Sequence, residues 1–130
     1  MSLEHRKFDW MVQRLSQLRG QAPAPRVFRL EMSRILAEIH RDPFDPDLDV
    51  RNLRRRCRLK DNNVSSRFRF AVGVTMREYI EEIRLQAARR LIDESRISVF
   101  EISLAVGYKH PQTFHSAFLR RFRHTPASRR

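Results

Sequence analysis

The sequence is poor in the residues that build disulfide frameworks, zinc sites and sharp turns. Among its 130 residues are one cysteine, Cys57, and only three glycines. A single cysteine excludes an internal disulfide framework and a zinc site with several thiolate ligands, and it fits a reducing compartment. We therefore interpret Cys57 as a small core residue on the apolar side of a helix.

Long apolar runs are also missing. No stretch approaches the roughly 18 consecutive apolar residues of a membrane span, and no apolar segment behind a charged start resembles a signal peptide. We therefore expect a cytoplasmic protein without a membrane partner. The strict alternation of Val, Ile or Thr with polar residues that marks strands does not occur either. The apolar periodicity is helical, and we expect an all-α fold.

Acidic residues are few compared with basic ones. The chain has 27 Lys and Arg against 15 Asp and Glu, a formal net charge of +12 and a pI of about 11.4. Such a charge favours an extended anionic partner, with nucleic acid first. The basic residues are concentrated, since residues 51–70 contain eight Lys or Arg and one acid. The 41% of apolar residues suffices for a core in one domain or in two very small ones.

Apolar residues at helical spacing predict a series of short helices. These are expected over residues 8–18, 27–40, 50–57, 62–72 and 76–94. A linker at 21–25 separates the first two, because Pro23 and Pro25 favour extended geometry. Asp61 or Asn62 is placed to cap the helix at 62–72.

Two capping-box patterns mark further helix starts. Thr75 and Glu78 have the spacing at which a hydroxyl and a carboxylate bond to each other's backbone amides. Ser98 and Glu101 repeat this spacing. The long helix between the two patterns has an apolar stripe that we expect to lie in the core, and its members are Tyr79, Ile80, Ile83, Ala87 and Leu91.

The stretch SVFEISLAVGYKHPQTFHSAFLRRF, near the C-terminus, predicts two helices joined by a sharp turn. Gly107 can adopt the positive φ that such a turn needs. Pro111 can begin the second helix, where its missing N–H is harmless. An apolar sector of the second helix would then face the first: Phe114, Ala117, Phe118 and Phe122 against Val99, Ile102 and Val106. This arrangement indicates a helix-turn-helix whose second member is the recognition helix.

The opposite side of that second helix has short polar side chains that fit a DNA major groove. We expect Gln112, Thr113 and Ser116 to contact bases, since Gln can pair with adenine and Ser or Thr with several bases. Cations around this face are expected to contact phosphates. They are Lys109, His110, Arg120, Arg121 and Arg123 in this half of the chain, and Lys60, Arg67 and Arg69 in the basic stretch.

These residues resemble the AraC/XylS family of bacterial transcription regulators. The resemblance covers about residues 30–126 and is most specific over 83–126. It rests on IRLQAARRLI, on ISVFEISLAVGY, on F-x-x-x-F at Phe114 and Phe118, and on the RRF and TP that follow. The first half is matched by VRNLRRRCRLKDNNVSSRF and GVTMREYI.

The resemblance implies two helix-turn-helix units joined by a central helix, with recognition helices in successive major-groove segments. The expected segments are an N-terminal helix and linker at 1–25, a first unit at 26–73, the central helix at 74–95 and a second unit at 96–130. Base contacts in the first unit are implied for Asn62, Ser65 and Ser66. The expected partner is double-stranded DNA. RNA polymerase, a second copy and a separate effector domain stay open as partners, and residues 1–25 are too few for an effector domain.

Four positions depart from the family pattern. Arg58 occupies a turn position that is often glycine, and Arg123 replaces a frequent glycine after the last aromatic. Arg67 occupies a position where an apolar residue is common, and together with Arg58 it predicts a first unit that is distorted or shifted by one residue. Ser116 replaces a longer side chain, which predicts weaker discrimination at one base.

Two other classes of protein are alternatives to a transcription regulator. A non-specific architectural or RNA-binding helical protein would bind through charge alone, whereas a regulator should prefer its site by roughly a thousandfold or more. An enzyme is disfavoured, because no glycine-rich phosphate loop, nucleophile elbow or pair of carboxylates occurs. His110 and His115 lack the spacing of a common ligand pair. We expect no catalytic residue, cofactor or metal, and the choice between activator and repressor stays open.

Overall fold

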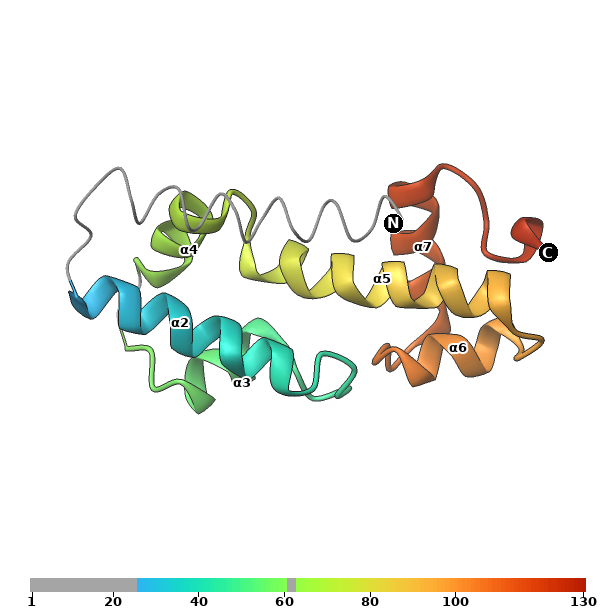
Figure 1. Cartoon of the computed structure of the whole chain (residues 1–130). Helices are drawn as coiled ribbons and strands as arrows, with labels where there is room; N and C mark the ends of the chain where they lie inside the picture. Colours follow the sequence, from blue (N-terminus) through green and yellow to red (C-terminus); the bar gives the residue numbers. More distant parts are fainter. Residues whose placement is uncertain (1–25, 61–62) are drawn as a thin grey trace. The chain divides into compact units, whose positions relative to one another are not determined.

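The computed structural model describes residues 26–60 and 63–130, and every regular element in these ranges is a helix (Figure 1). The helices are α2 (Arg26–Arg41), α3 (Val50–Arg56), α4 (Val64–Val72), α5 (Met76–Glu94), α6 (Val99–Ala105) and α7 (Pro111–Phe122), followed by a 3-10 turn, η1 (Ala127–Arg129). The predicted all-α fold is confirmed. The helix expected at 8–18, the linker at 21–25 and the two expected caps, Asp61 and Asn62, lie outside the described residues.

The helix boundaries follow the sequence signals closely, with a difference at α4. Helix α5 begins and ends at the predicted residues, Met76 and Glu94. Helix α4 begins at Val64 rather than at residue 62. Its N-cap residue is Asn63, with φ −88° and ψ 1°, and the Asn63 side chain makes no capping hydrogen bond. An N-cap side chain reaches the helix amides from an extended backbone, and Asn63 does not have one.

Both predicted capping pairs form the bond from the glutamate amide to the hydroxyl. Glu78 N donates to Thr75 Oγ1 at 3.1 Å, and Glu101 N donates to Ser98 Oγ at 3.1 Å. The Thr75 hydroxyl also donates to the Glu78 carboxylate at 2.9 Å. Each glutamate further places a negative charge in the first turn, where the helix dipole favours it. Local sequence therefore determines where α5 and α6 begin.

The chain divides into two compact units. The N-terminal unit contains α2, α3, α4 and the first turn of α5, up to Tyr79. The C-terminal unit contains the rest of α5, from Ile80, with α6, α7 and η1. It also contains the loop at 42–49, although this loop precedes α3 in the sequence. Helical periodicity gives no sign of that last assignment, because it depends on contacts between distant residues.

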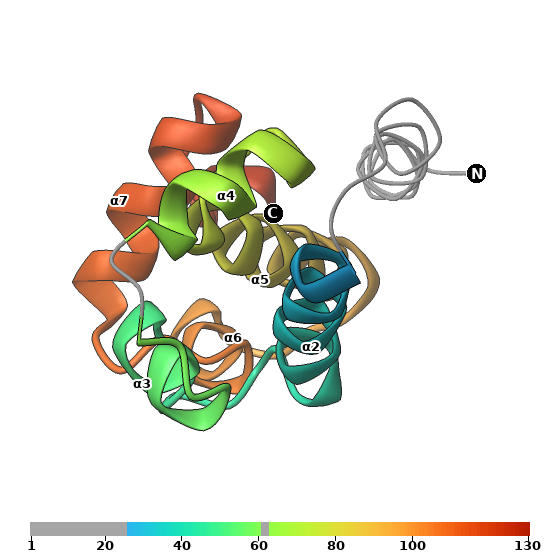
Figure 2. The ribbon, with the colours of Figure 1, turned by 90° about the vertical axis from the view of Figure 1, so that its left-hand side faces the viewer.

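The core of the N-terminal unit is formed where α2, α3 and α4 meet (Figures 1 and 2). Its fully buried side chains include Met32, Ile35, Ile39, Leu53, Val64 and Phe68, and Cys57 is only 2% exposed. The Phe68 and Tyr79 rings meet edge to face with centroids 5.9 Å apart. The interpretation of Cys57 as a core residue is confirmed, and burial raises the pKa of its thiol.

The core of the C-terminal unit lies between α6, α7 and the second part of α5. Its buried members are Leu85, Ala88, Ile92, Ile102, Val106, Tyr108, Phe114, Ala117 and Phe118. The predicted stripe on α5 is only partly right. Tyr79 and Ile80 are buried, but Ile83, Ala87 and Leu91 are half-buried, and the deepest α5 residues here are Leu85 and Ala88. A helix that contributes to two units does not bury one continuous stripe.

Candidate nucleic-acid interface

Helix α7 has a buried aromatic face and an exposed polar face. Phe114 and Phe118 are 1% and 0% exposed. Gln112, Thr113 and Ser116, the residues predicted to contact bases, are all exposed. The two faces therefore lie as the sequence predicted, and short polar side chains project from a helix whose other side is fixed in the core.

Aromatic rings meet along the buried face of α7 and at its two ends, mostly edge to face. Ring centroids are 5.4 Å apart between Tyr108 and Phe114, 5.7 Å between Phe114 and Phe118, and 4.7 Å between Phe118 and Phe122. His124 adds a ring 5.5 Å from Phe118. Aromatic pairs at these distances add stability beyond their buried area. Phe114 and Phe118 also belong to the core of the C-terminal unit, so the polar face of α7 lies opposite a packed side.

The turn before α7 depends on Gly107. Its φ is 104°, a conformation that L side chains rarely adopt. A Cβ at this position would lie 2.9 Å from Arg84 Nε and 3.0 Å from the Phe44 carbonyl oxygen. Gly107 is therefore required both by its backbone conformation and by the lack of space around it.

Arg84, on α5, fills that space and ties the 42–49 loop to the C-terminal unit. It is 9% exposed, and its guanidinium donates to the carbonyls of Pro43, Asp45 and Leu48 at 2.8–2.9 Å. Burial lowers the pKa of Arg84, while Tyr108 acts in the opposite direction. This buried arginine could not be predicted from the sequence, because its three acceptors are backbone atoms.

Three of the cations predicted to contact phosphate in the C-terminal unit have carboxylate partners. Arg121 bonds to both Glu82 oxygens, at 2.8 and 2.9 Å. Arg120 lies 3.2 Å from Glu81 Oε1, but its side chain is 65% exposed. Lys109 lies 3.2 Å from Asp47 Oδ1, with both side chains more than half exposed. Arg120 and Lys109 are themselves exposed, so their ion pairs are weak in water and can exchange for other anions, whereas Arg121 is held more firmly.

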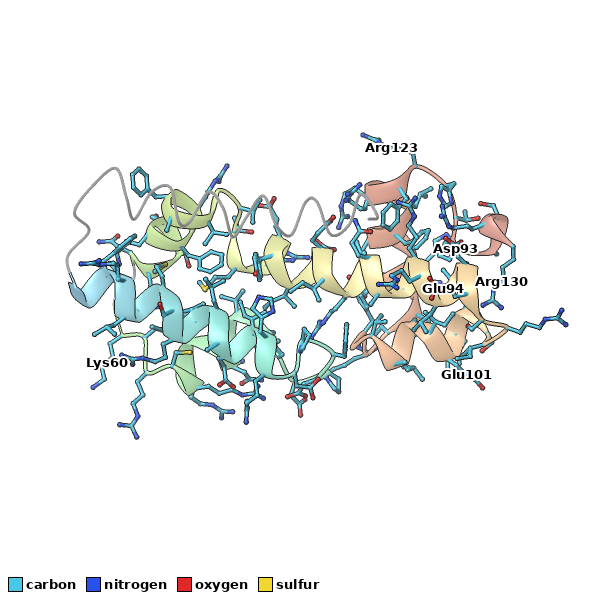
Figure 3. All side chains as sticks on the ribbon, viewed as in Figure 1. Lys60, Asp93, Glu94, Glu101, Arg123 and Arg130 are labelled. Carbon is cyan, nitrogen blue, oxygen red and sulfur yellow. The ribbon has the colours of Figure 1, made fainter. Side chains whose placement is uncertain are left out.

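Arg123 and His110 flank α7 without such carboxylate contacts in the described part of the chain. Arg123 is the C-cap residue of α7, with φ 67°, and its N–H donates to the Leu119 carbonyl at 2.8 Å. Its side chain extends away from the helix (Figure 3). His110 is exposed at the N-cap with an extended backbone. Both are accessible to an anion.

Helix α4 occupies the recognition-helix position of the N-terminal unit. Ser65 and Ser66 are exposed on its surface, while Val64 and Phe68 are buried. Asn62, the other predicted base contact, lies outside the described residues. The exposed serines match the pattern of α7, with short polar groups opposite an apolar face.

The cations of the N-terminal unit differ in their surroundings. Arg67 bonds to both carboxylate oxygens of Glu31, at 2.8 and 2.9 Å, and is half-buried. Lys60 and Arg69 are exposed, and Lys60 extends from the loop after α3 (Figure 3). The Arg67 pair also explains how an arginine fits where the family pattern has an apolar residue. Glu31 neutralises its charge, and α4 forms as a regular helix.

Beside Gln112 lie exposed residues that are not among the contacts predicted from the sequence. His115 and Leu119 are exposed on α7. A groove of about 370 Å³ between α6 and α7 is lined by Gln112, His115 and Phe100, among others. The sequence contains the pattern that could have identified them, since residues 112, 115 and 119 recur at helical spacing and so share one face of α7.

Neither a cluster of metal ligands nor a membrane-spanning helix is found in the described part of the chain. Within 26–60 and 63–130, no three His, Cys, Asp or Glu side chains gather as a metal site would require. The helices in these ranges are also too short or too polar to cross a membrane.

Comparisons with known proteins point to the same class. Residues 50–130 match the helix-turn-helix domain family HTH_18. The regulator AlkR of Acinetobacter baylyi is 31% identical over 96 residues, which are 74% of this chain and 31% of AlkR. The regulator GlxA of Rhizobium meliloti is 36% identical over 83 residues, 64% of this chain and 26% of GlxA. The chain thus spans less than a third of these curated relatives.

A solved structure supports the fold. The C-terminal domain of the two-component response regulator yesN from Fusobacterium nucleatum has a TM-score of 0.69, with 22% identity, 74% of this chain covered and 93% of that domain. The fold and the sequence matches together define a helix-turn-helix protein. More specifically, the chain belongs to the AraC/XylS family of transcription regulators, whose members bind DNA sequence-specifically.

Proposed function

We propose that this chain binds double-stranded DNA sequence-specifically and is the DNA-binding part of a transcription regulator. The observation that carries the proposal is the polar face of α7, with Gln112, Thr113 and Ser116 exposed opposite a buried aromatic face. A helix fixed by its core side and polar on its outer side is suited to the major groove. RNA polymerase at a promoter is the protein partner that this role implies.

We propose that Gln112 makes the most discriminating contact. It lies next to Pro111 in the first turn of α7, and N-terminal residues of a recognition helix contact base edges. An amide can donate and accept at once, which matches the adenine edge in the major groove. Thr113 and Ser116 would add contacts to neighbouring bases, and Ser65 and Ser66 would serve the same role on α4.

The surrounding cations would supply the sequence-independent attraction. Arg123, His110, Lys60 and Arg69 are exposed, and Arg120 and Lys109 are exposed cations whose carboxylate partners can be exchanged for phosphate. Contacts to phosphates set the register of a protein on DNA and make its affinity depend on salt. Arg67 and Arg121 would have to leave a bidentate carboxylate first, so we assign them the smallest share.

The test compares two variants after selection of a preferred site from a random DNA pool. Gln112→Ala should relax the preference at one or two base pairs, by about 1–3 kcal/mol of discrimination, and leave the salt dependence nearly unchanged. Arg120→Ala should weaken binding to all sequences about equally. Affinities are measured on the selected site, on single-base variants and on random duplex.

A control separates the two roles of Arg120. Removing this side chain also leaves Glu81 without its partner, and a bare carboxylate near DNA would repel phosphates. Glu81→Gln combined with Arg120→Ala removes that repulsion. If Gln112→Ala weakens all sequences alike, or none, α7 does not contact bases there, and a non-specific DNA- or RNA-binding protein becomes the better description.

A further inference from the structure

The outward face of α3 is a stripe of arginines. Arg51 and Arg55 are exposed and lie one turn apart on α3, and Arg58 is exposed in the turn that follows. None of the three side chains has a hydrogen-bond or ion-pair partner among residues 26–60 and 63–130. Three guanidinium groups without a partner in these ranges, two on α3 and one in the turn after it, attract an anion with regularly spaced charges.

The equivalent helix of the C-terminal unit has an apolar outward face instead. Aligning α3 with α6 pairs buried Leu53 with buried Ile102, and buried Cys57 with buried Val106. The same alignment pairs the three arginines, Arg51, Arg55 and Arg58, with Phe100, Leu104 and Gly107. The two helices therefore share their core positions and differ in what they present to a partner.

Arg58 also has an unfavourable backbone conformation. Its φ is 55°, in the left-handed region, where Gly107 provides the corresponding turn without a side chain. The turn is closed by backbone bonds from Arg58 N to the Arg55 carbonyl at 3.1 Å and from Leu59 N to the Arg54 carbonyl at 2.8 Å. Glycine would form the same turn at lower free energy. A strained residue in an exposed turn is a reason to look for a function of its side chain.

We propose that Arg51, Arg55 and Arg58 contact DNA phosphates and that the N-terminal unit thereby supplies most of the non-specific affinity. The proposal rests on the proposed function. The first helix of a helix-turn-helix crosses the DNA backbone, which is the position of α3. Other cations have carboxylate partners in both units: Arg56 and Arg67 in the N-terminal unit, and Lys109, Arg120 and Arg121 in the C-terminal unit. The left-handed arginine is retained for its phosphate contact at the expense of stability.

The experiment measures folding stability and DNA affinity on the same variant, Arg58→Gly. Removing the strain should raise Tm by about 2–8 °C. Losing one phosphate contact should reduce the slope of log affinity against log salt by about 0.9. At 0.1 M salt this change in slope lowers the affinity for random duplex about eightfold. Arg58→Gly should therefore raise stability and lower DNA affinity at once. If Arg58 had only a structural role, the variant would not lose affinity while becoming more stable.

Matched variants separate charge from strain. Arg51→Gln and Arg55→Gln should each reproduce the loss of affinity and slope without the gain in Tm, because both residues are in regular helix. Arg58→Lys should keep most of the slope, since the charge remains. All are measured on random duplex and on the site selected by the parent chain.

Each result bears directly on the proposal. A higher Tm together with lower affinity and a smaller salt slope supports it. Unchanged DNA affinity in the three arginine variants overturns it and assigns the stripe to another anionic partner, while an intact effect of Gln112→Ala would show that the proposed function still holds. A parent chain that binds neither the selected site nor random duplex would overturn both.

Discussion

The substitution Gly107→Ala tests the account of the turn between α6 and α7 most directly. Two separate costs should add. Alanine at φ 104° is strained, by at least about 1–2 kcal/mol. Its Cβ would also meet Arg84 Nε at 2.9 Å, Arg84 Cζ at 3.0 Å and the Phe44 carbonyl oxygen at 3.0 Å. Such overpacking adds about 1–3 kcal/mol, and the sum is about 2–5 kcal/mol.

Arg84 cannot move away from this overlap without a cost in free energy. Its guanidinium is fixed by three carbonyl acceptors, so a shift would lengthen hydrogen bonds to a buried charge. A double-mutant cycle with Arg84→Leu isolates this contribution, because leucine ends at Cδ and has no atoms at the Nε and Cζ positions. Gly107→Ala should cost about 1–2 kcal/mol less in the Arg84→Leu background.

Urea unfolding of the four proteins in the cycle, followed by circular dichroism, gives the free energies. Gly73→Ala is the control for the backbone term, since Gly73 is exposed and has φ 95°. If Gly107→Ala costs no more than Gly73→Ala, the space around Gly107 is not restricted. A coupling energy near zero would show that Arg84 does not restrain the turn.

Two further predictions concern stability. Phe118→Ala should cost about 3–5 kcal/mol, because the ring is 0% exposed and contacts three other rings, and melts that match the parent would remove Phe118 from the core. Asp93→Asn should cost less than about 1 kcal/mol at neutral pH. The hydrogen bonds from Arg129, at 2.6 and 2.7 Å, lower the pKa of Asp93. The stabilisation from this pair is therefore fully present above the ordinary aspartate pKa. It is lost as the pH falls through the lowered pKa of Asp93 in the folded protein. Parent and variant should therefore have equal Tm in acid, and a difference that persists there would contradict the assignment.

Features that depend on neighbouring residues could be predicted from the sequence. The capping pairs at Thr75 and Ser98, the glycine turn at Gly107 and the start of α7 at Pro111 each follow from a few adjacent side chains. The two faces of α7 follow from helical periodicity, and buried Phe118 lies opposite exposed Gln112 as expected. Such signals are local, and local propensity and tertiary structure agree here.

Ion pairs and the buried arginine could not be predicted. The partners Arg121 and Glu82 are 39 residues apart, and Arg84 and Pro43 are 41 apart. Which carboxylate approaches which cation depends on how α5 and α7 pack, and an arginine bound to backbone carbonyls has no specific partner residue to find. The departures at Arg58 and Arg67 predict a distorted or shifted first unit. In the described residues α3 and α4 are regular helices, and Arg58 has a positive φ.

The ion pairs change what the net charge of +12 implies for DNA binding. An unpaired arginine such as Arg55 that reaches a phosphate neutralises a DNA charge and releases a counterion. A paired arginine such as Arg121 must first leave Glu82, and the carboxylate then gathers its own counterions and repels the DNA. The salt slope should therefore follow the number of unpaired cations at the interface rather than the count of Lys and Arg. Two variants with equal net charge, Arg55→Gln and Arg121→Gln, should accordingly differ in slope, with the larger reduction in Arg55→Gln.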